Sequence, residues 1–340
     1  MAAADDLARV FLEDAENIAD GFIGAFNLRF EEEVGNLASP MHRWLDFVLR
    51  YVEPAKRKVD FSTGFWARVP QDVKTNVDRV VRLQCRNGDI NPYQSKGLLN
   101  NDVSGERRGQ RTDLLWADWG IHHFHLTEDD IAPGEYFSER SEWLLFAKVL
   151  QDAVFCIDVR HHPKGAGFAD DELLAIAVRN WPQIFEDWKA KGVLGLARTE
   201  PYSKEDIHAL RNGGVSTLYE IDGAVYVPPG VGVTSASTPT RVTLAANDIR
   251  RNVNALAAFS ANRDGDPSTL CRGGGVERPD WRLCLTTKGL AVYEKNLDMA
   301  WPIAQSAQLG GWAGKLAPAW AIARLAAIRG GVASLSPSLR

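Results

Sequence analysis

Hydrophobic and polar positions along the chain predict helices near the N-terminus. Apolar residues recur at helical spacing in residues 5–20 and 41–53, and Pro54 ends the second of these helices. A third helix is predicted over residues 70–86, where four valines form one apolar stripe. The N-terminal part of the chain, about residues 1–60, is therefore expected to be a helical region.

The pattern changes to strands in the middle of the chain. Residues 120–126 alternate between apolar and polar, residues 143–150 form a continuous apolar run, and residues 153–162 alternate again after a tight connection. Helices are predicted to follow over residues 170–180 and after Pro182. Residues 65–195 are thus expected to be a central α+β domain, an antiparallel sheet with flanking helices.

A second set of patterns begins near residue 200. A capping sequence at Ser203–Asp206 precedes a short helix, an Asp-Gly pair at 222–223 predicts a hairpin, and residues 281–294 predict another hairpin. We expect residues 200–296 to form a second α+β domain and the Ala- and Trp-rich residues 297–340 to form a helical tail. The predicted fold class is α+β.

Composition restricts the class of protein. The chain has 45% hydrophobic and 24% charged residues and a net charge of −5, so its overall charge does not attract nucleic acid, and any such binding needs a local basic patch. The four cysteines form no CxxC pair, which fits a reducing compartment. The acidic N-terminus is unlike a secretory signal, and no apolar run is long enough to span a bilayer. We expect a cytoplasmic protein with no membrane association.

Histidines are concentrated in the predicted sheet. Five of the seven lie between Arg111 and Pro163, and common sequence motifs for nucleotide binding, zinc proteases and serine hydrolases are absent. Histidine changes its protonation near neutral pH, so paired histidines beside cations can act as base and acid on a phosphodiester. Strand alternation nominates four catalytic residues, namely His123 and His125 from one strand and Arg160 and His162 from another.

A polar, Gly- and Asn-rich loop over residues 89–112 leads into the histidine region and is basic at its end. Its arginines, together with a lysine after the last strand, are the cations expected to bind substrate: Arg107, Arg108, Arg111 and Lys164.

Residues 70–165 resemble the RelE-type toxin ribonucleases in the order helix, basic loop, strand and hairpin. The segments that carry the resemblance are INPYQSKGLL, GIHHFHL, LLFAKVL and VFCIDVRHH, under a third of the chain. The resemblance implies a metal-independent ribonuclease, a toxin or defence effector with RNA as substrate and an antitoxin or other protein as partner. By position it nominates Arg160, His161 and His162. The toxins are small and basic, with arginines and lysines where this chain has histidines.

Two alternatives remain open from the sequence. His123, His125, Asp158 and His162 could instead bind a metal ion in a hydrolase, because alternate residues on a strand make good ligand pairs. The histidines could also pack in a polar-aromatic layer of a binding or adaptor protein without enzymatic activity. The ribonuclease hypothesis requires no cofactor, and the sequence does not define the oligomeric state.

Overall fold

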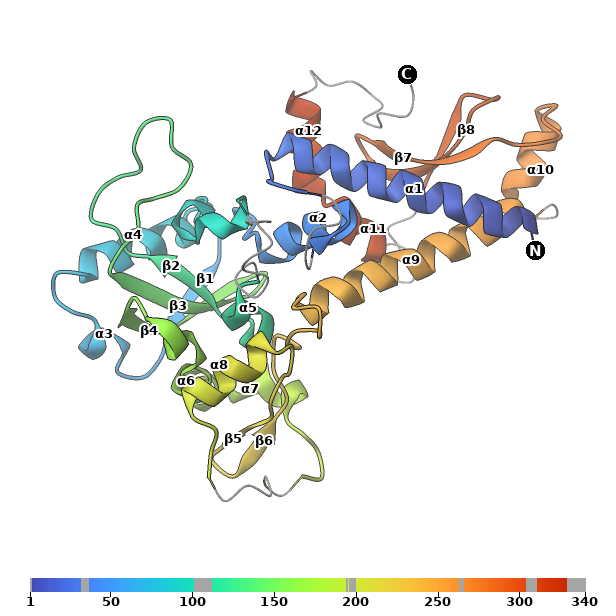
Figure 1. The fold of residues 1–340 in the computed structure, drawn as a ribbon. Helices are drawn as coiled ribbons and strands as arrows, with labels where there is room; N and C mark the ends of the chain where they lie inside the picture. Colours follow the sequence, from blue (N-terminus) through green and yellow to red (C-terminus); the bar gives the residue numbers. More distant parts are fainter. Residues whose placement is uncertain are drawn as a thin grey trace. The chain divides into compact units, whose positions relative to one another are not determined.

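The computed structural model describes residues 2–31, 37–100, 112–193, 195, 200–262, 266–303 and 311–328. The chain forms two compact units: a central unit, residues 50–241, and a terminal unit, which combines residues 1–49 with residues 242–340. Each unit has its own sheet or sheets and its own helices (Figure 1). The predicted α+β class is confirmed.

The central unit is built on a four-stranded sheet in the order β1-β4-β3-β2. β2, β3 and β4 are the three predicted antiparallel strands, and β1 adds a short parallel edge strand beside β4 that the sequence analysis did not identify. The strands are β1 (Lys58–Phe61), β2 (His122–His125), β3 (Trp143–Val149) and β4 (Ala153–His161).

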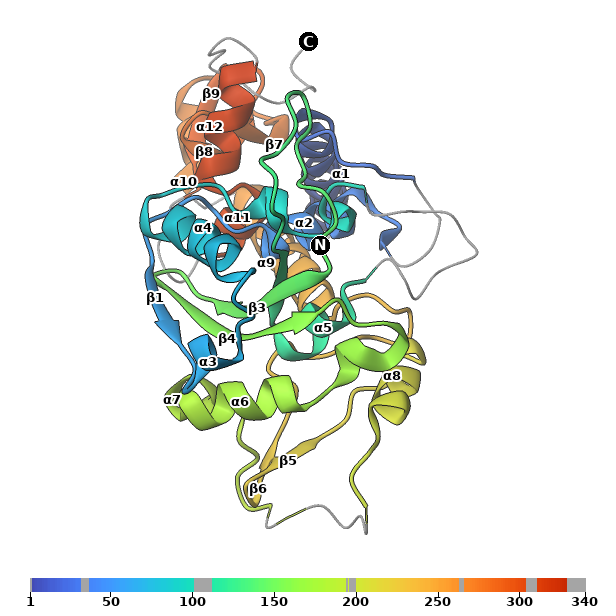
Figure 2. The same cartoon turned by 90° about the vertical axis from the view of Figure 1, so that its left-hand side faces the viewer.

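Helices cover both faces of this sheet (Figure 2). One face of the sheet packs against the valine stripe of α4, and the other face packs against α5, α6 and α7. Of these, α5 was not predicted; Asp113 caps its first turn and Gly120, with φ of 66°, ends it. The helices are α3 (Phe65–Arg68), α4 (Lys74–Cys85), α5 (Leu114–Trp119), α6 (Glu172–Asn180) and α7 (Pro182–Phe185), with 3₁₀ helices η2 (Asn91–Tyr93), η3 (Lys96–Leu98), η5 (Gly165–Ala169) and η6 (Glu186–Trp188).

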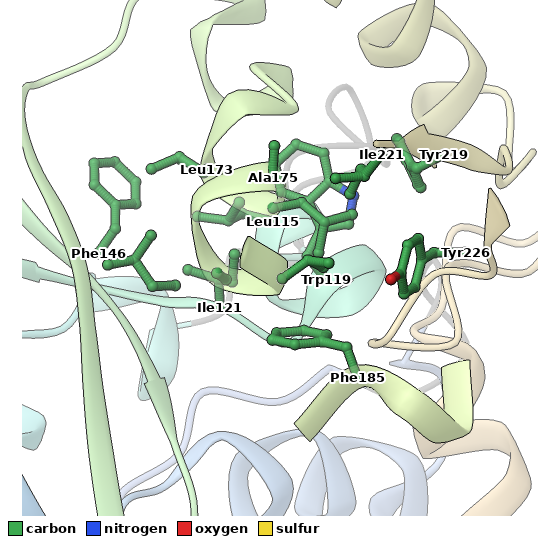
Figure 3. Close-up of a cluster of buried hydrophobic side chains, with 14 of the residues drawn as sticks. Leu115, Trp119, Ile121, Phe146, Leu173, Ala175, Phe185, Tyr219, Ile221 and Tyr226 are labelled. Carbon is green, nitrogen blue, oxygen red and sulfur yellow. The ribbon is translucent and has the colours of Figure 1, made fainter. Parts of the chain in front are cut away.

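The central unit also contains α8 (Lys204–Asn212) and the hairpin β5 (Tyr219–Ile221) and β6 (Ala224–Tyr226). Figure 3 shows Trp119 of α5 enclosed by side chains from β3, α6, α7 and this hairpin. The structure thus groups residues 200–241 with the histidine strands, whereas the sequence analysis placed them in a second domain over 200–296. The physical reason is a shared apolar core, which local sequence patterns do not reveal.

The terminal unit joins the two ends of the chain. In α1, Asp14 accepts hydrogen bonds from the guanidinium of Arg282 and from the backbone N–H of Leu283 on β7. In α2, the indole of Trp44 stacks on Phe22 with ring centroids 4.6 Å apart. Nε1 of Trp44 also donates to the carbonyl oxygen of Leu316. Residues 1–49 and the C-terminal part of the chain, which the sequence analysis expected to be separate, therefore form one packed unit, whereas residues 50–60 belong to the central unit.

The elements of the terminal unit include a three-stranded sheet, β7-β8-β9. Its first two strands form the predicted hairpin, and β9 lies where the sequence analysis expected the start of a helical tail. The elements are α1 (Ala2–Ala25), α2 (Pro40–Arg50), α9 (Thr240–Ala261), α10 (Asp266–Gly273), β7 (Trp281–Thr286), β8 (Gly289–Glu294), β9 (Met299–Pro302), α11 (Gly311–Leu316) and α12 (Ala319–Ile328). None of the described helices is both long enough and apolar enough to cross a membrane.

Candidate functional site

A cleft of about 1040 Å³ in the central unit collects histidines from three elements. Four of the chain's seven histidines line it: His123 and His125 from β2, His162 from the segment after β4, and His208 from α8. We call this site the histidine cleft. Its other walls include the segment 94–97 at the start of η3, the start of α5, the segment 138–140 and η5. Three of the four catalytic residues nominated from sequence are thus brought together.

Strand alternation places the first two histidines. His123 and His125 are two residues apart on β2, so both side chains lie on the same face of the sheet, with ring centroids 6.3 Å apart. The ring of His162 stacks beside His125 at 5.8 Å and 24°. All three rings therefore lie close enough together to contact one small substrate group.

A β-bulge determines on which face of the sheet the side chains at the end of β4 lie. Phe146 pairs with Asp158 and Ala147 pairs with Cys156, so Ile157 is an extra residue opposite no partner. Uninterrupted alternation along residues 153–162 would place Phe155, Ile157 and Val159 on one face. Because of the bulge, Phe155 and Ile157 pack with the core that contains Trp119, whereas Val159 packs on the opposite face with α4.

Asp113 supplies an acidic partner to the cleft. Its Oδ1 accepts the backbone N–H of Trp116 as the N-cap of α5, and its Oδ2 lies 3.5 Å from Nδ1 of His123 and 3.7 Å from the Arg50 guanidinium. Burial raises the pKa of this carboxyl, but His123 and Arg50 outweigh it and hold the pKa below its ordinary value. An ionised Asp113 therefore favours the tautomer of His123 that carries its proton on Nδ1, although the 3.5 Å contact does not have hydrogen-bond geometry.

The neighbours of the ring nitrogens define which ones can exchange protons. Nδ1 of His125 accepts the backbone N–H of Ser141 at 3.2 Å, so a neutral ring has its proton on Nε2. Nδ1 of His162 lies 3.0 Å from the carbonyl oxygen of Pro163 and donates to it. Nδ1 of His123 faces Asp113. In the neutral rings of His123 and His162, Nε2 is therefore a proton acceptor, whereas in the neutral ring of His125, Nε2 carries the proton and is a donor.

Burial keeps the β2 histidines uncharged. Desolvation lowers the pKa of His123 despite the opposing effect of Asp113. It also lowers the pKa of His125 to about 4, aided by repulsion from His123 and His162. A neutral imidazole at neutral pH is the form that a general base requires.

The remaining sequence nominations lie elsewhere. Arg160 donates to Asp158 at 2.8 Å and to Asp170 at 2.6 Å, and it does not line the cleft. It therefore connects β4 to the segment after η5 and is not placed to bind substrate. Lys164 is exposed outside the cleft lining, and His161 is exposed beside Glu142 and Trp143. Arg107, Arg108 and Arg111 lie outside the described residues.

The metal alternative loses one of its ligands. The Asp158 carboxylate is occupied by Arg68 at 2.9 Å and Arg160 at 2.8 Å, because the bulge directs it into this ion network. Across the described ranges of the chain, no three His, Cys, Asp or Glu side chains are placed to hold one metal ion.

Several residues of the cleft were not predicted from the sequence. Lys96 and Arg140 are exposed cations on its wall, and Phe168 of η5 lies 5.3 Å from His123 and 5.7 Å from His162 by ring centroids. Arg211 reaches the cleft from α8 while its guanidinium stacks on Trp119 at 4.1 Å. No local motif marks these positions, since they approach the histidines only through the fold. Asp113 had one available signal, a capping residue before LLWADW.

We expect the buried histidines to make the folded state acid-sensitive. Burial lowers the pKa of His122 to about 3 and that of His125 to about 4, against 6.5 for an exposed ring. Between these values the unfolded chain binds more protons, so stability falls as the pH drops below 6.5. The loss should be about 1–2 kcal/mol per ring between pH 7 and pH 5 in urea unfolding. His122→Asn should show a shallower pH dependence; a slope equal to that of the unaltered protein would contradict this explanation.

Neither protein-family models, curated proteins nor solved structures match this chain. The geometry of the histidine cleft is therefore the basis for assigning a function.

Proposed function

We propose that the histidine cleft cleaves RNA by metal-independent general acid–base catalysis. The observation that carries the proposal is the pair Asp113 and His123, which faces the same cleft as His125 and His162. The resemblance of residues 70–165 to RelE-type toxin ribonucleases points the same way. A cytoplasmic toxin or defence effector with a neutralising protein partner is the corresponding biological role.

The proposed reaction requires a neutral His123, the form that its burial favours, and a protonated His162. Nε2 of neutral His123 removes the proton of the ribose 2′-hydroxyl, and the 2′-oxygen attacks phosphorus. Protonated His162 gives the proton on Nε2 to the departing 5′-oxygen, and the products are a 2′,3′-cyclic phosphate and a 5′-hydroxyl end. The N–H of His125 donates to a non-bridging oxygen, and Lys96 and Arg140 supply positive charge to the phosphate backbone.

Cleavage of total cellular RNA by the purified full-length chain, with and without EDTA, tests the proposal. We expect cleavage in both samples and 3′ ends that are cyclic phosphates; DNA should remain intact because it lacks the attacking hydroxyl. His162→Ala should lower the rate by about 10²–10⁴-fold. The adjacent exposed residue provides a matched control, and His161→Ala should keep the full rate.

Two results would oppose the proposal. Loss of cleavage with EDTA would indicate a metal-dependent hydrolase. A fully active His162→Ala variant would remove His162 from the reaction.

A further inference from the structure

A second cavity, of about 280 Å³, lies in the terminal unit. It is bounded by α9, the β7-β8-β9 sheet and α11, which belong to the terminal unit. We call it the tryptophan pocket, because Trp281, Trp301 and Trp312 line it. None of the described residues that form its walls is charged.

The aromatic walls favour a flat ligand. The rings of Trp281 and Trp301 meet at 5.4 Å and 66°, close to an edge-to-face arrangement, and Trp312 is 3% exposed. Aromatic rings attract other rings in edge-to-face or offset geometry as well as burying apolar area. The volume lies just below the roughly 300–1,000 Å³ of pockets for drug-sized ligands, so it suits a molecule of one or two rings.

Two further observations favour a bound ligand in this pocket. Ser260 lines it and is 1% exposed, yet its hydroxyl has no hydrogen-bond partner among the described residues. A buried hydroxyl without a partner is unfavourable, and a ligand with a polar hydrogen would satisfy it. Phe259 also lines the pocket while remaining 53% exposed, so a large apolar ring is left partly in water.

We propose that the tryptophan pocket binds an uncharged, planar aromatic molecule of one or two rings that donates a hydrogen bond to Ser260. The site is separate from the histidine cleft, so the inference does not depend on the proposed RNA cleavage. The absence of charge among the described wall residues excludes carboxylates and phosphates, because a charged group would be desolvated without a counter-ion.

Binding of indole to the full-length chain tests the proposal, with indene as a matched ligand of the same shape that lacks the N–H group. We expect saturable binding in isothermal titration calorimetry with a Kd of about 10 µM to 1 mM, a range reasonable for so small a ligand. Indole-3-carboxylate should not bind. Ser260→Ala should weaken indole about fivefold, the effect of one hydrogen bond, and leave indene unchanged.

Two alanines on α9 provide matched variants. Ala255 lines the pocket and is exposed, whereas Ala258 is also exposed on the same helix but lies outside the lining. Ala255→Phe should fill the pocket and abolish binding of both ligands, and Ala258→Phe should retain it; circular dichroism checks that both variants fold.

Three outcomes would overturn the inference. The first is that neither indole nor indene shows saturable binding up to its solubility limit. The second is that the Ala255→Phe variant binds the ligands as well as the unaltered protein does. The third is that the protein binds no ligand and that Ala255→Phe converts an oligomer to a monomer. The last result would assign the pocket to a second copy of the chain.

Discussion

Replacing His123 with alanine should lower kcat/KM for RNA cleavage by about 10²–10⁴-fold, the usual contribution of a general base. His123 has the most complete support in the cleft, since the Asp113 carboxylate faces its Nδ1 and burial holds it neutral. Initial rates on a defined oligoribonucleotide give the measurement. A loss confined to KM would show that His123 binds substrate and does not transfer the proton.

Asp113→Asn tests the same pair from the other side. Asparagine is as good an N-cap as aspartate, so α5 should remain intact while the charge facing His123 is lost. We expect a loss of activity of about 10²–10⁴-fold, because the imidazolium formed during the reaction loses its carboxylate partner. An unchanged rate would mean that the 3.5 Å contact between Asp113 and His123 has no role in the reaction.

Asp118→Ala should produce the largest loss of stability in the central unit. Asp118 is 1% exposed, and its Oδ2 accepts Nε of Arg211 at 2.8 Å and the hydroxyl of Tyr219 at 2.5 Å. Removing it leaves a buried guanidinium without its counter-ion, at a cost of about 3–5 kcal/mol in the free energy of unfolding. Urea unfolding at pH 7 measures this cost.

The contact between Arg79 and Asp130 provides the control, because the Asp130 side chain is 96% exposed in an ion pair of 3.8 Å. Asp130→Ala should cost no more than about 1 kcal/mol. Replacing Asp118 and Arg211 together with apolar residues should cost less than Asp118→Ala alone, since no charge is then left buried. Equal effects of Asp118→Ala and Asp130→Ala would show that the buried network does not stabilise the unit.

Local periodicity predicted most of the secondary structure. The strands at β2, β3 and β4 follow the alternation and apolar runs of the sequence, and the valine stripe of α4 faces the sheet as expected. β1 was missed because it has only four residues, whereas β2, although equally short, lies within the longer alternating run 120–126. α5 was missed because its five buried residues surround the whole helix and leave no polar face to define a period.

Long-range packing was not predictable from local patterns. The pairing of Asp14 with Arg282 joins residues 268 positions apart, and the pairing of Asp118 with Arg211 joins residues 93 apart. The candidate site was predicted only in part, because some of its residues meet through long-range packing. Alternation on one strand indicated His123 and His125, whereas the bulge at Ile157 and the approach of α8 decided the surroundings of Arg160 and Arg211.

The carboxylate of Asp113 makes two different contacts: one oxygen caps α5, and the other faces His123. Any event that changes the charge at His123 therefore also changes the strength of the hydrogen bond from the Trp116 amide. That amide is a built-in spectroscopic reporter: its proton resonance registers the ionisation of the cleft without a label, a substrate or a change in the sequence.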